Sequence, residues 1–262
     1  MRTARIFPRK TNATPDDEHA YVGRVPEGYD HYDISVTFSW DIQAAERLAE
    51  KCPGKVSLGG PAFGSPGGDF EPGKYLKKGY VITSRGCPNQ CWFCDVHKRE
   101  GDIRELPITE GWDILDSNLL ACSDHHVWKV FNMLSRQPKK ARFTGGLDTK
   151  ILKQWHVDGL RKLKPYCVYV AYDTPDDLEP LVEAGRKFVL AGFTKASHKL
   201  RCYVLCGHHG DTIENAEKRM KETWAAGFLP MAMVYRDRNY QDWAGFQRSF
   251  SRPAITAGLL KG

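Results

Sequence analysis

The sequence has no long apolar run, no internal repeat and no low-complexity tract. Without an apolar segment of about 20 residues, it offers no transmembrane helix of ordinary length. The first residues, MRTARIFPRKTNATPDDEHA, lack the apolar core of a secretory signal peptide. We therefore expect a cytoplasmic protein, in which thiols stay reduced and clustered cysteines indicate metal binding or catalysis rather than disulfides.

No large excess of one charge is present either. The net charge is +6, and the 41% hydrophobic and 27% charged residues are typical of a globular chain. Basic residues gather in four short stretches, at Lys77-Lys78, Lys139 to Arg142, Lys195 to Arg201 and Arg236 to Arg238. Such stretches suit a nucleic acid or another anionic substrate. Charge alone favours the simpler interpretation, a solvated surface.

The amino-terminal part of the chain divides into two predicted segments. Residues 1–31 are polar and interrupted by three prolines, which predicts an extended arm. Residues 32–79 begin with an apolar run at Tyr32 to Phe38, continue with an amphipathic stretch, and reach a second run at Lys55 to Gly60. This pattern predicts a small βαβ unit followed by a Gly/Pro-rich linker.

From residue 80 onward, strand-like runs alternate with helical stretches. Such alternation predicts an α/β fold with a parallel sheet. Six repeats over residues 80–236 predict a partial (β/α)6 TIM-like barrel, and residues 237–262 predict a tail packed on it. The runs are YVITS, WDILDSN, ARFTGG, CVYVAYD, RCYVLCG and PMAMVYR, and the helical stretches are 124–136, 149–164, 175–187 and 211–226.

Three cysteines lie close together in SRGCPNQCWFCDVHK, directly after the first of these strands. Cys87, Cys91 and Cys94 have the spacing C-x3-C-x2-C, and His97 follows. In βα barrels the chemistry lies at the carboxyl ends of strands, which is where this loop falls. Four ligands suit a zinc ion, although zinc modules usually take two separate pairs. Three thiolates on an iron–sulfur cluster leave one iron open for a substrate. Core packing is the weakest interpretation, because the loop is polar.

The stretch Cys87-Pro-Asn-Gln-Cys91-Trp-Phe-Cys94 resembles the signature of radical S-adenosylmethionine (SAM) enzymes, with aromatic Phe93 before the third cysteine. The resemblance implies a partial (β/α)6 barrel and a [4Fe-4S] cluster on these three cysteines. It also implies SAM bound at the open iron, with Phe93 beside the cofactor. One electron from an external flavodoxin- or ferredoxin-type donor would cleave SAM. The resulting 5′-deoxyadenosyl radical would abstract hydrogen from a substrate.

A second stretch carries the same resemblance. CGHHGDTIEN, from Cys206 to Asn215, is similar to the G-F-P-G-E-T segment of the methylthiotransferase-like and cobalamin-associated branch. Gly207, Gly210 and Thr212 match that segment, and Asp211 replaces its glutamate. The match implies that Gly207 and Asp211 line the side of the cofactor, where two glycines permit close backbone approach.

The sequence also departs from that superfamily. Where many members have Gly-Gly-Glu to hold the methionyl amino group, this chain has LDSNLL, so Asp116 and Asn118 are assigned to that role. No D-x-H-x-x-G segment supplies a histidine for cobalt, and we expect no cobalamin. Only Cys52 lies upstream of the cluster loop, where methylthiotransferases have three cysteines. Sulfur insertion by their route is therefore not expected.

Several single residues have two interpretations each. Asp173 either holds ribose hydroxyls or substrate, or it is the N-cap residue of the next helix. For Asp148, the N-cap interpretation is favoured. Arg236 binds the SAM carboxylate or an anionic substrate, or it is a surface arginine. His208 and His209 are candidates for acid–base chemistry. His97 is expected to face solvent, and the remaining cysteines are expected to pack as small core residues: Cys122, Cys167, Cys202 and Cys206.

Three hypotheses about function result. The leading one is a radical SAM enzyme, an oxidoreductase or transferase whose substrate is a metabolite, a peptide or a nucleic acid. The alternative is a zinc-stabilised nucleic-acid-binding module, based on the Cys3His spacing and the basic stretches. A third is a barrel that holds the cluster and only relays electrons.

Overall fold

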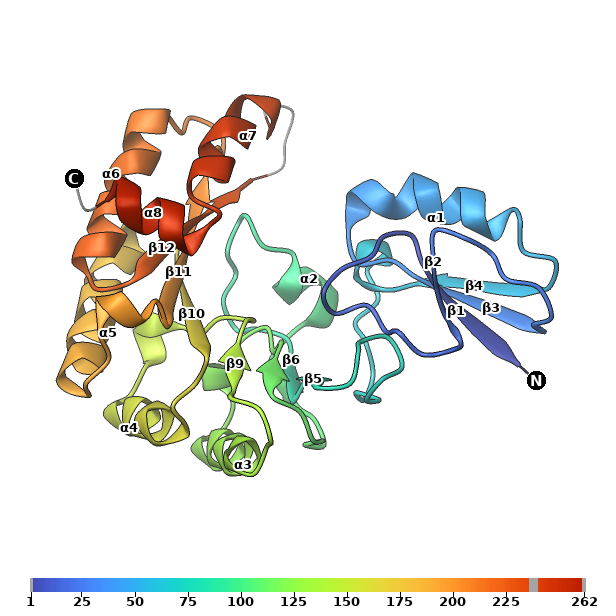
Figure 1. Cartoon of the computed structure of the whole chain (residues 1–262), viewed down its shortest axis with the longest axis horizontal. Helices are drawn as coiled ribbons and strands as arrows, with labels where there is room; N and C mark the ends of the chain where they lie inside the picture. Colours follow the sequence, from blue (N-terminus) through green and yellow to red (C-terminus); the bar gives the residue numbers. More distant parts are fainter. Residues whose placement is uncertain (1, 236–239, 261–262) are drawn as a thin grey trace. The chain divides into compact units, whose positions relative to one another are not determined.

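The computed structural model describes residues 2–235 and 240–260 (Figure 1). The chain divides into two compact units, residues 1–111 (unit 1) and 112–262 (unit 2). Among the described residues, no helix has both the length and the apolar composition needed to cross a membrane.

Unit 1 begins with a parallel sheet in the strand order β2-β1-β3-β4. Helix α1 buries Ala45 and Leu48, three residues apart on one face, against Ile6 and Ile34 of the sheet. The βα unit from β3 to β4 therefore forms where the sequence predicts it. The elements are β1 (Thr3–Phe7), β2 (Ala20–Val22), β3 (His31–Ser35), α1 (Ile42–Ala49) and β4 (Lys55–Gly59).

The first 31 residues are not the extended arm that the sequence suggests. Strand β1 lies inside the sheet, between β2 and β3, and pairs Ile6 with Ile34. Ala4 and Ile6 alternate with partly exposed neighbours and are fully buried. Two inward residues are too few to give a strong periodic signal, and the prolines of this stretch fall between strands or after them. The prediction is therefore corrected: the arm is part of the first sheet.

The predicted boundary between residues 79 and 80 also differs from the structure, in which the division follows Gly111. The Gly/Pro-rich segment is bound to both its sequence neighbours. Arg5 of β1 donates to the carbonyls of Gly73 and Lys74 at 2.7 and 2.5 Å. Arg85 donates to the carbonyl of Gly68 at 3.2 Å. The rest of unit 1 comprises η2 (Pro61–Phe63), β5 (Tyr80–Val81), β6 (Ser84–Arg85), α2 (Val96–Glu100) and β7 (Arg104–Glu105).

Within unit 2, parallel strands run in the order β12-β11-β10-β9-β8, as the alternation of strands and helices predicts (Figure 1). Helices α5 and α6 pack on β10 to β12, and the tail helices α7 and α8 contact β12. The α/β fold with parallel sheets is confirmed. The strands are β8 (Asp113–Ile114), β9 (Arg142–Phe143), β10 (Cys167–Tyr172), β11 (Leu200–Cys206) and β12 (Leu229–Val234).

The helical elements of unit 2 follow the predicted stretches closely, and several begin with a 3-10 turn. Trp243 and Phe250 of the tail are buried, and Phe246 contacts both rings. The helices are α3 (Asp124–Ser135), α4 (Gln154–Leu163), α5 (Leu178–Leu190), α6 (Ile213–Ala225), α7 (Tyr240–Ser249) and α8 (Pro253–Leu259). The 3-10 turns are η3 (Leu119–Ala121), η4 (Thr149–Ile151), η5 (Pro175–Asp177) and η6 (Lys195–Ser197).

Candidate functional site

The three clustered cysteines lie on one loop of unit 1, between β6 and α2. We call residues 86–95 the cysteine loop. Strand β6 pairs antiparallel with β7, which returns directly after α2, so both ends of the loop are fixed by the same hairpin. Cys87, Cys91 and Cys94 are each half-buried, and none of them is in a disulfide. Their thiols are therefore in the reduced form that binds metals.

The entry to the cysteine loop depends on Gly86. Its φ is +88°, a conformation that favours glycine, and a Cβ there would overlap the carbonyl oxygen of Asp102. The Gly86 N–H donates to the Glu100 carboxylate at 2.9 Å, and the Cys87 N–H donates to the Gly101 carbonyl at 3.1 Å. These contacts join the start of the loop to the end of α2.

Charged side chains of both signs surround the cysteine loop. The Glu100 side chain is 4% exposed and pairs with Arg99 at 2.7 Å and with Arg85 at 3.9 Å. Of the charged side chains near the Cys94 thiol, Arg99 favours the thiolate and Asp95 opposes it. Burial raises the pKa of the Cys94 thiol, and Cys87 and Asp95 add to that shift; the backbone at Val96 and the Arg99 guanidinium oppose it. Metal binding would have to displace this proton.

The donor set can be tested against the two metal hypotheses. Among the described residues, no three His, Cys, Asp or Glu side chains converge on one point as the ligands of a single ion would. A zinc ion needs such convergence. In an iron–sulfur cluster each thiolate binds a different iron, so the sulfurs can lie apart. Three thiols on one loop provide the three protein ligands that a cluster with one open iron needs, so the donor set fits that group.

His97 is not the solvent-facing residue that we expected. It lies on α2 and is half-buried, and its Nδ1 is buried with no hydrogen-bond partner among the described residues. Phe93 is half-buried and packs edge-on against Trp92, with 5.3 Å between the ring centroids. The Trp92 side chain itself is largely exposed.

In unit 2, the residues predicted on the second strand are buried at its carboxyl end. Asp116 and Asn118 follow β8 and are 1% and 4% exposed. The Asn118 amide donates to Asp148 at 3.2 Å. Asp148 also accepts the Lys150 N–H at 3.0 Å and caps η4, which confirms the favoured interpretation of that residue.

Asp173 follows β10 at the same end of the sheet. It does not cap the next helical turn, because Thr174 is the N-cap residue there and Asp177 completes a capping box. The cap interpretation of Asp173 is therefore wrong. Burial raises the pKa of Asp173 to about 7, and the nearby Asp177 adds to the shift, against Lys150. A carboxyl group with this pKa exchanges protons near neutral pH.

The loop after β11 is held from inside by Asp211. Its side chain is 1% exposed, accepts the Gly207 N–H at 2.8 Å and pairs with Arg219 of α6 at 2.6 Å. Gly207 has a φ of +72° and lies against the ring of Trp243, where a Cβ would be 2.9 Å from ring atoms. The buried Asp211 side chain thus fixes the loop from inside, and the backbone of the loop lies outside this side chain.

The other predicted residues of unit 2 divide clearly. Cys202 and Cys206 in β11 are fully buried, as is Cys167, and Cys122 is largely buried, so the packing interpretation is confirmed for all four. Burial raises the pKa of Cys206 to about 12. His209 is exposed and His208 half-buried. Arg236 lies outside the described residues.

Sequence reasoning missed the two residues that hold the loops, Glu100 and Arg219. Each carries a weak signal. Arg219 comes eight residues after Asp211, about two helical turns, which places it over the loop that precedes α6. Glu100 is the last residue of a five-residue helix and the acidic member of KRE.

Comparison with known proteins gives a structural likeness but no match in sequence. No protein-family model matches the chain, and no curated protein does so. Among solved structures, the chain is similar to TsrM, a radical S-adenosylmethionine methyltransferase from Kitasatospora setae, solved with cobalamin and a [4Fe-4S] cluster bound. The TM-score is 0.59 at 12% identity, over 88% of this chain and 74% of that chain. The match exceeds either unit alone and so includes parts of both. At this identity it shows the fold.

Proposed function

We propose that the protein is a radical SAM enzyme that holds a [4Fe-4S] cluster on Cys87, Cys91 and Cys94. The observation that carries the proposal is the cysteine loop: three reduced, half-buried thiols with C-x3-C-x2-C spacing on a hairpin-fixed loop. The likeness of the fold to that of a radical SAM methyltransferase supports it. The finer architecture that we propose for residues 80–236 is the partial (β/α)6 barrel.

The cluster, when bound, would supply the single electron that cleaves SAM and starts radical chemistry on a substrate. The chain's own contribution at the loop is to hold three thiolates and leave one iron position without a protein ligand. Arg99 provides positive charge that favours a deprotonated thiol at Cys94. Glu100 keeps this guanidinium group in place and accepts the backbone N–H at the start of the loop.

For SAM itself we propose the residues that the resemblance assigns. They are Phe93, Asp116, Asn118, Asp173, Gly207, Asp211 and Arg236. Of these, Asp173 has the raised pKa of a group suited to proton exchange, and Asp211 would act by shaping the Gly207 loop. We further propose that an external flavodoxin- or ferredoxin-type protein donates the electron. The reducing cytoplasm is the compartment that suits such a cluster.

The test is anaerobic reconstitution of the full chain with iron and sulfide. A brown protein absorbing near ~400 nm, with about four iron atoms per chain, is the expected result. With dithionite it should convert SAM to methionine and 5′-deoxyadenosine. A colourless protein that instead retains zinc would favour the zinc-stabilised module. A brown protein that binds no SAM by calorimetry would be an electron relay.

A further inference from the structure

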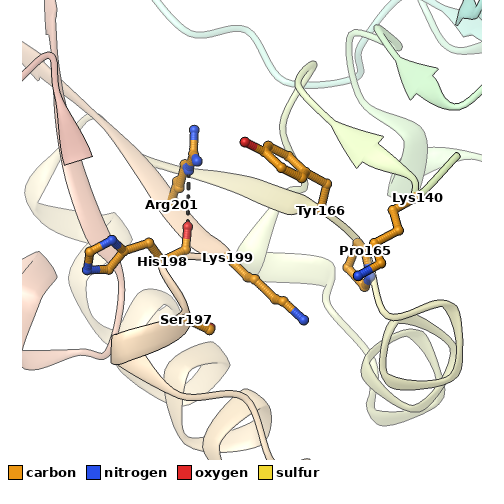
Figure 2. A pocket seen from close by; sticks show the side chains of 7 residues that line it. All are labelled: Lys140, Pro165, Tyr166, Ser197, His198, Lys199 and Arg201. Carbon is orange, nitrogen blue, oxygen red and sulfur yellow. Dashed lines mark hydrogen bonds between the residues drawn. The ribbon is translucent and has the colours of Figure 1, made fainter. Parts of the chain in front are cut away.

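A basic pocket lies at the amino ends of β10 and β11 in unit 2. It has a volume of about 380 Å³. Figure 2 shows Lys140 and Tyr166 on one side and His198, Lys199 and Arg201 on the other, with the Tyr166 hydroxyl turned toward Arg201. The pocket brings together two basic stretches that lie about sixty residues apart in the sequence, Lys139 to Arg142 and Lys195 to Arg201.

Arg201 is held in position before any ligand arrives. Its Nε donates to the His198 carbonyl at 3.2 Å (Figure 2). Its Nη1 donates to the Tyr169 hydroxyl at 2.8 Å. A guanidinium group fixed in this way loses little conformational entropy when it binds an anion. Both hydrogen-bond acceptors of Arg201 are neutral groups, a backbone carbonyl and a hydroxyl, so they do not balance its positive charge.

A second cavity of about 240 Å³ adjoins the first and shares Ser197 and Lys199 with it. Arg161 and Lys164 extend the positive charge along this cavity. Neither cavity has an Asp or Glu in its lining. The two adjoining basic cavities together form an elongated site, which we call the basic groove. A track of cations suits a ligand with repeated negative charges.

The basic groove also contains an aromatic ring. Tyr166 is 53% exposed, and the Arg142 guanidinium lies 4.9 Å from its ring centroid. Asp113 partly balances Arg142, at 3.5 Å. Grooves that bind single-stranded nucleic acids combine backbone-tracking cations with aromatic rings on which bases stack. A small phosphorylated metabolite needs neither the second cavity nor the exposed ring.

We propose that the basic groove binds single-stranded nucleic acid through its phosphodiester backbone, with a base stacked on Tyr166. Strand β10 has six residues, so the groove and the carboxyl end that bears Asp173 are about 20 Å apart within unit 2. A nucleic acid bound in the groove would therefore lie at the amino ends of the β-strands, away from the carboxyl end that bears Asp173. The proposal does not depend on the cluster, and its test is independent of SAM cleavage.

The test measures fluorescence anisotropy of labelled single strands, RNA and DNA, of about 12 nucleotides. It uses the full-length chain before and after reconstitution. Lys140→Glu/Lys199→Glu should weaken binding about tenfold or more. The matched control Lys129→Glu/Lys221→Glu changes the net charge equally at exposed positions outside both cavities, and it should bind within about twofold of wild type.

Two further measurements separate nucleic acid from other polyanions. Lys140→Gln/Lys199→Gln should reduce the slope of log K against log salt by about 1.4, or 0.7 for each lost phosphate contact. Tyr166→Ala should weaken single-strand binding about fivefold or more while leaving heparin binding unchanged, and Tyr166→Phe should retain affinity. No binding at low salt, equal loss in the control variant, or preference for duplex over single strand would overturn the proposal. Circular dichroism checks that each variant folds.

Discussion

The cysteine loop of unit 1 and the loop after β11 in unit 2 are fixed in the same way. Each begins at a glycine with positive φ whose N–H donates to a buried carboxylate, and an arginine pairs with that carboxylate. In the cysteine loop the partners are Gly86 and Glu100, at 2.9 Å. In unit 2 they are Gly207 and Asp211, at 2.8 Å.

What differs is the origin of the carboxylate. Asp211 lies inside its own loop, four residues after Gly207, and closes a tight turn. Glu100 lies outside its loop, at the end of α2. Its hydrogen bond to Gly86 therefore joins the start of the ten-residue cysteine loop to a residue that follows the loop. The cysteine loop therefore carries its three thiols on side chains between two fixed ends, whereas the turn after β11 is closed by its own Asp211. This difference agrees with the proposal that the cluster is held by the cysteine loop and not by the loop after β11.

The largest effect should come from the cysteines. Cys87→Ala, Cys91→Ala or Cys94→Ala should each abolish nearly all bound iron and all SAM cleavage, because the three thiolates are the whole proposed ligand set. Iron and sulfide analysis after anaerobic reconstitution measures this. Cys52→Ala and Cys167→Ala are the controls and should keep wild-type iron content. A single-site variant of the loop that keeps a full cluster would refute the assignment.

Breaking the buried ion pair of unit 2 comes next. Asp211→Ala leaves Arg219 without its buried partner, and we expect a loss of about 3–5 kcal/mol of stability. Chemical denaturation measures it. Arg186→Ala, which breaks an exposed pair with Glu183, should cost less than about 1 kcal/mol. Equal losses in the two variants would mean that the Asp211 pair does not hold its loop.

The comparison also depends on the glycine at the start of each loop. Gly86→Ala combines a left-handed φ with overlap on the Asp102 carbonyl, and should cost about 1–3 kcal/mol and lower the iron content. Gly64→Ala is the matched control in unit 1: its φ is +71°, but nothing lies within 4 Å of the added Cβ. In thermal unfolding, the melting temperature of Gly86→Ala should be well below that of Gly64→Ala. The reverse order would contradict this account of the loop.

The smallest effect concerns pH. The folded pKa of Asp173 is raised from 3.8 to about 7, so the folded state binds more protons than the unfolded state between these values. Stability from this residue is therefore present below about pH 4 and is lost as the pH rises to about 7. Asp173→Asn removes the dependence. The melting temperature of wild type minus that of the variant should fall from pH 5 to pH 8, and a constant difference would show that Asp173 has an ordinary pKa.

Much of unit 2 was predictable, because β10, β11 and β12 are buried runs of six or seven residues separated by amphipathic helices. The cysteine loop was recognisable from spacing alone. Strand β1 was not, because it has only two inward residues and polar surroundings. The roles of Glu100 and Arg219 depend on contacts across a loop. The basic groove depends on residues of β11 and of the segment before β9 meeting in space, which no local pattern reveals.

The central claim is that the cysteine loop holds a cluster with one iron open to SAM. Electron paramagnetic resonance of the dithionite-reduced, reconstituted protein, recorded with and without SAM, tests it most directly. If SAM binds the open iron, its addition should shift the cluster signal in wild type. A full cluster whose signal is unchanged by saturating SAM would contradict the account.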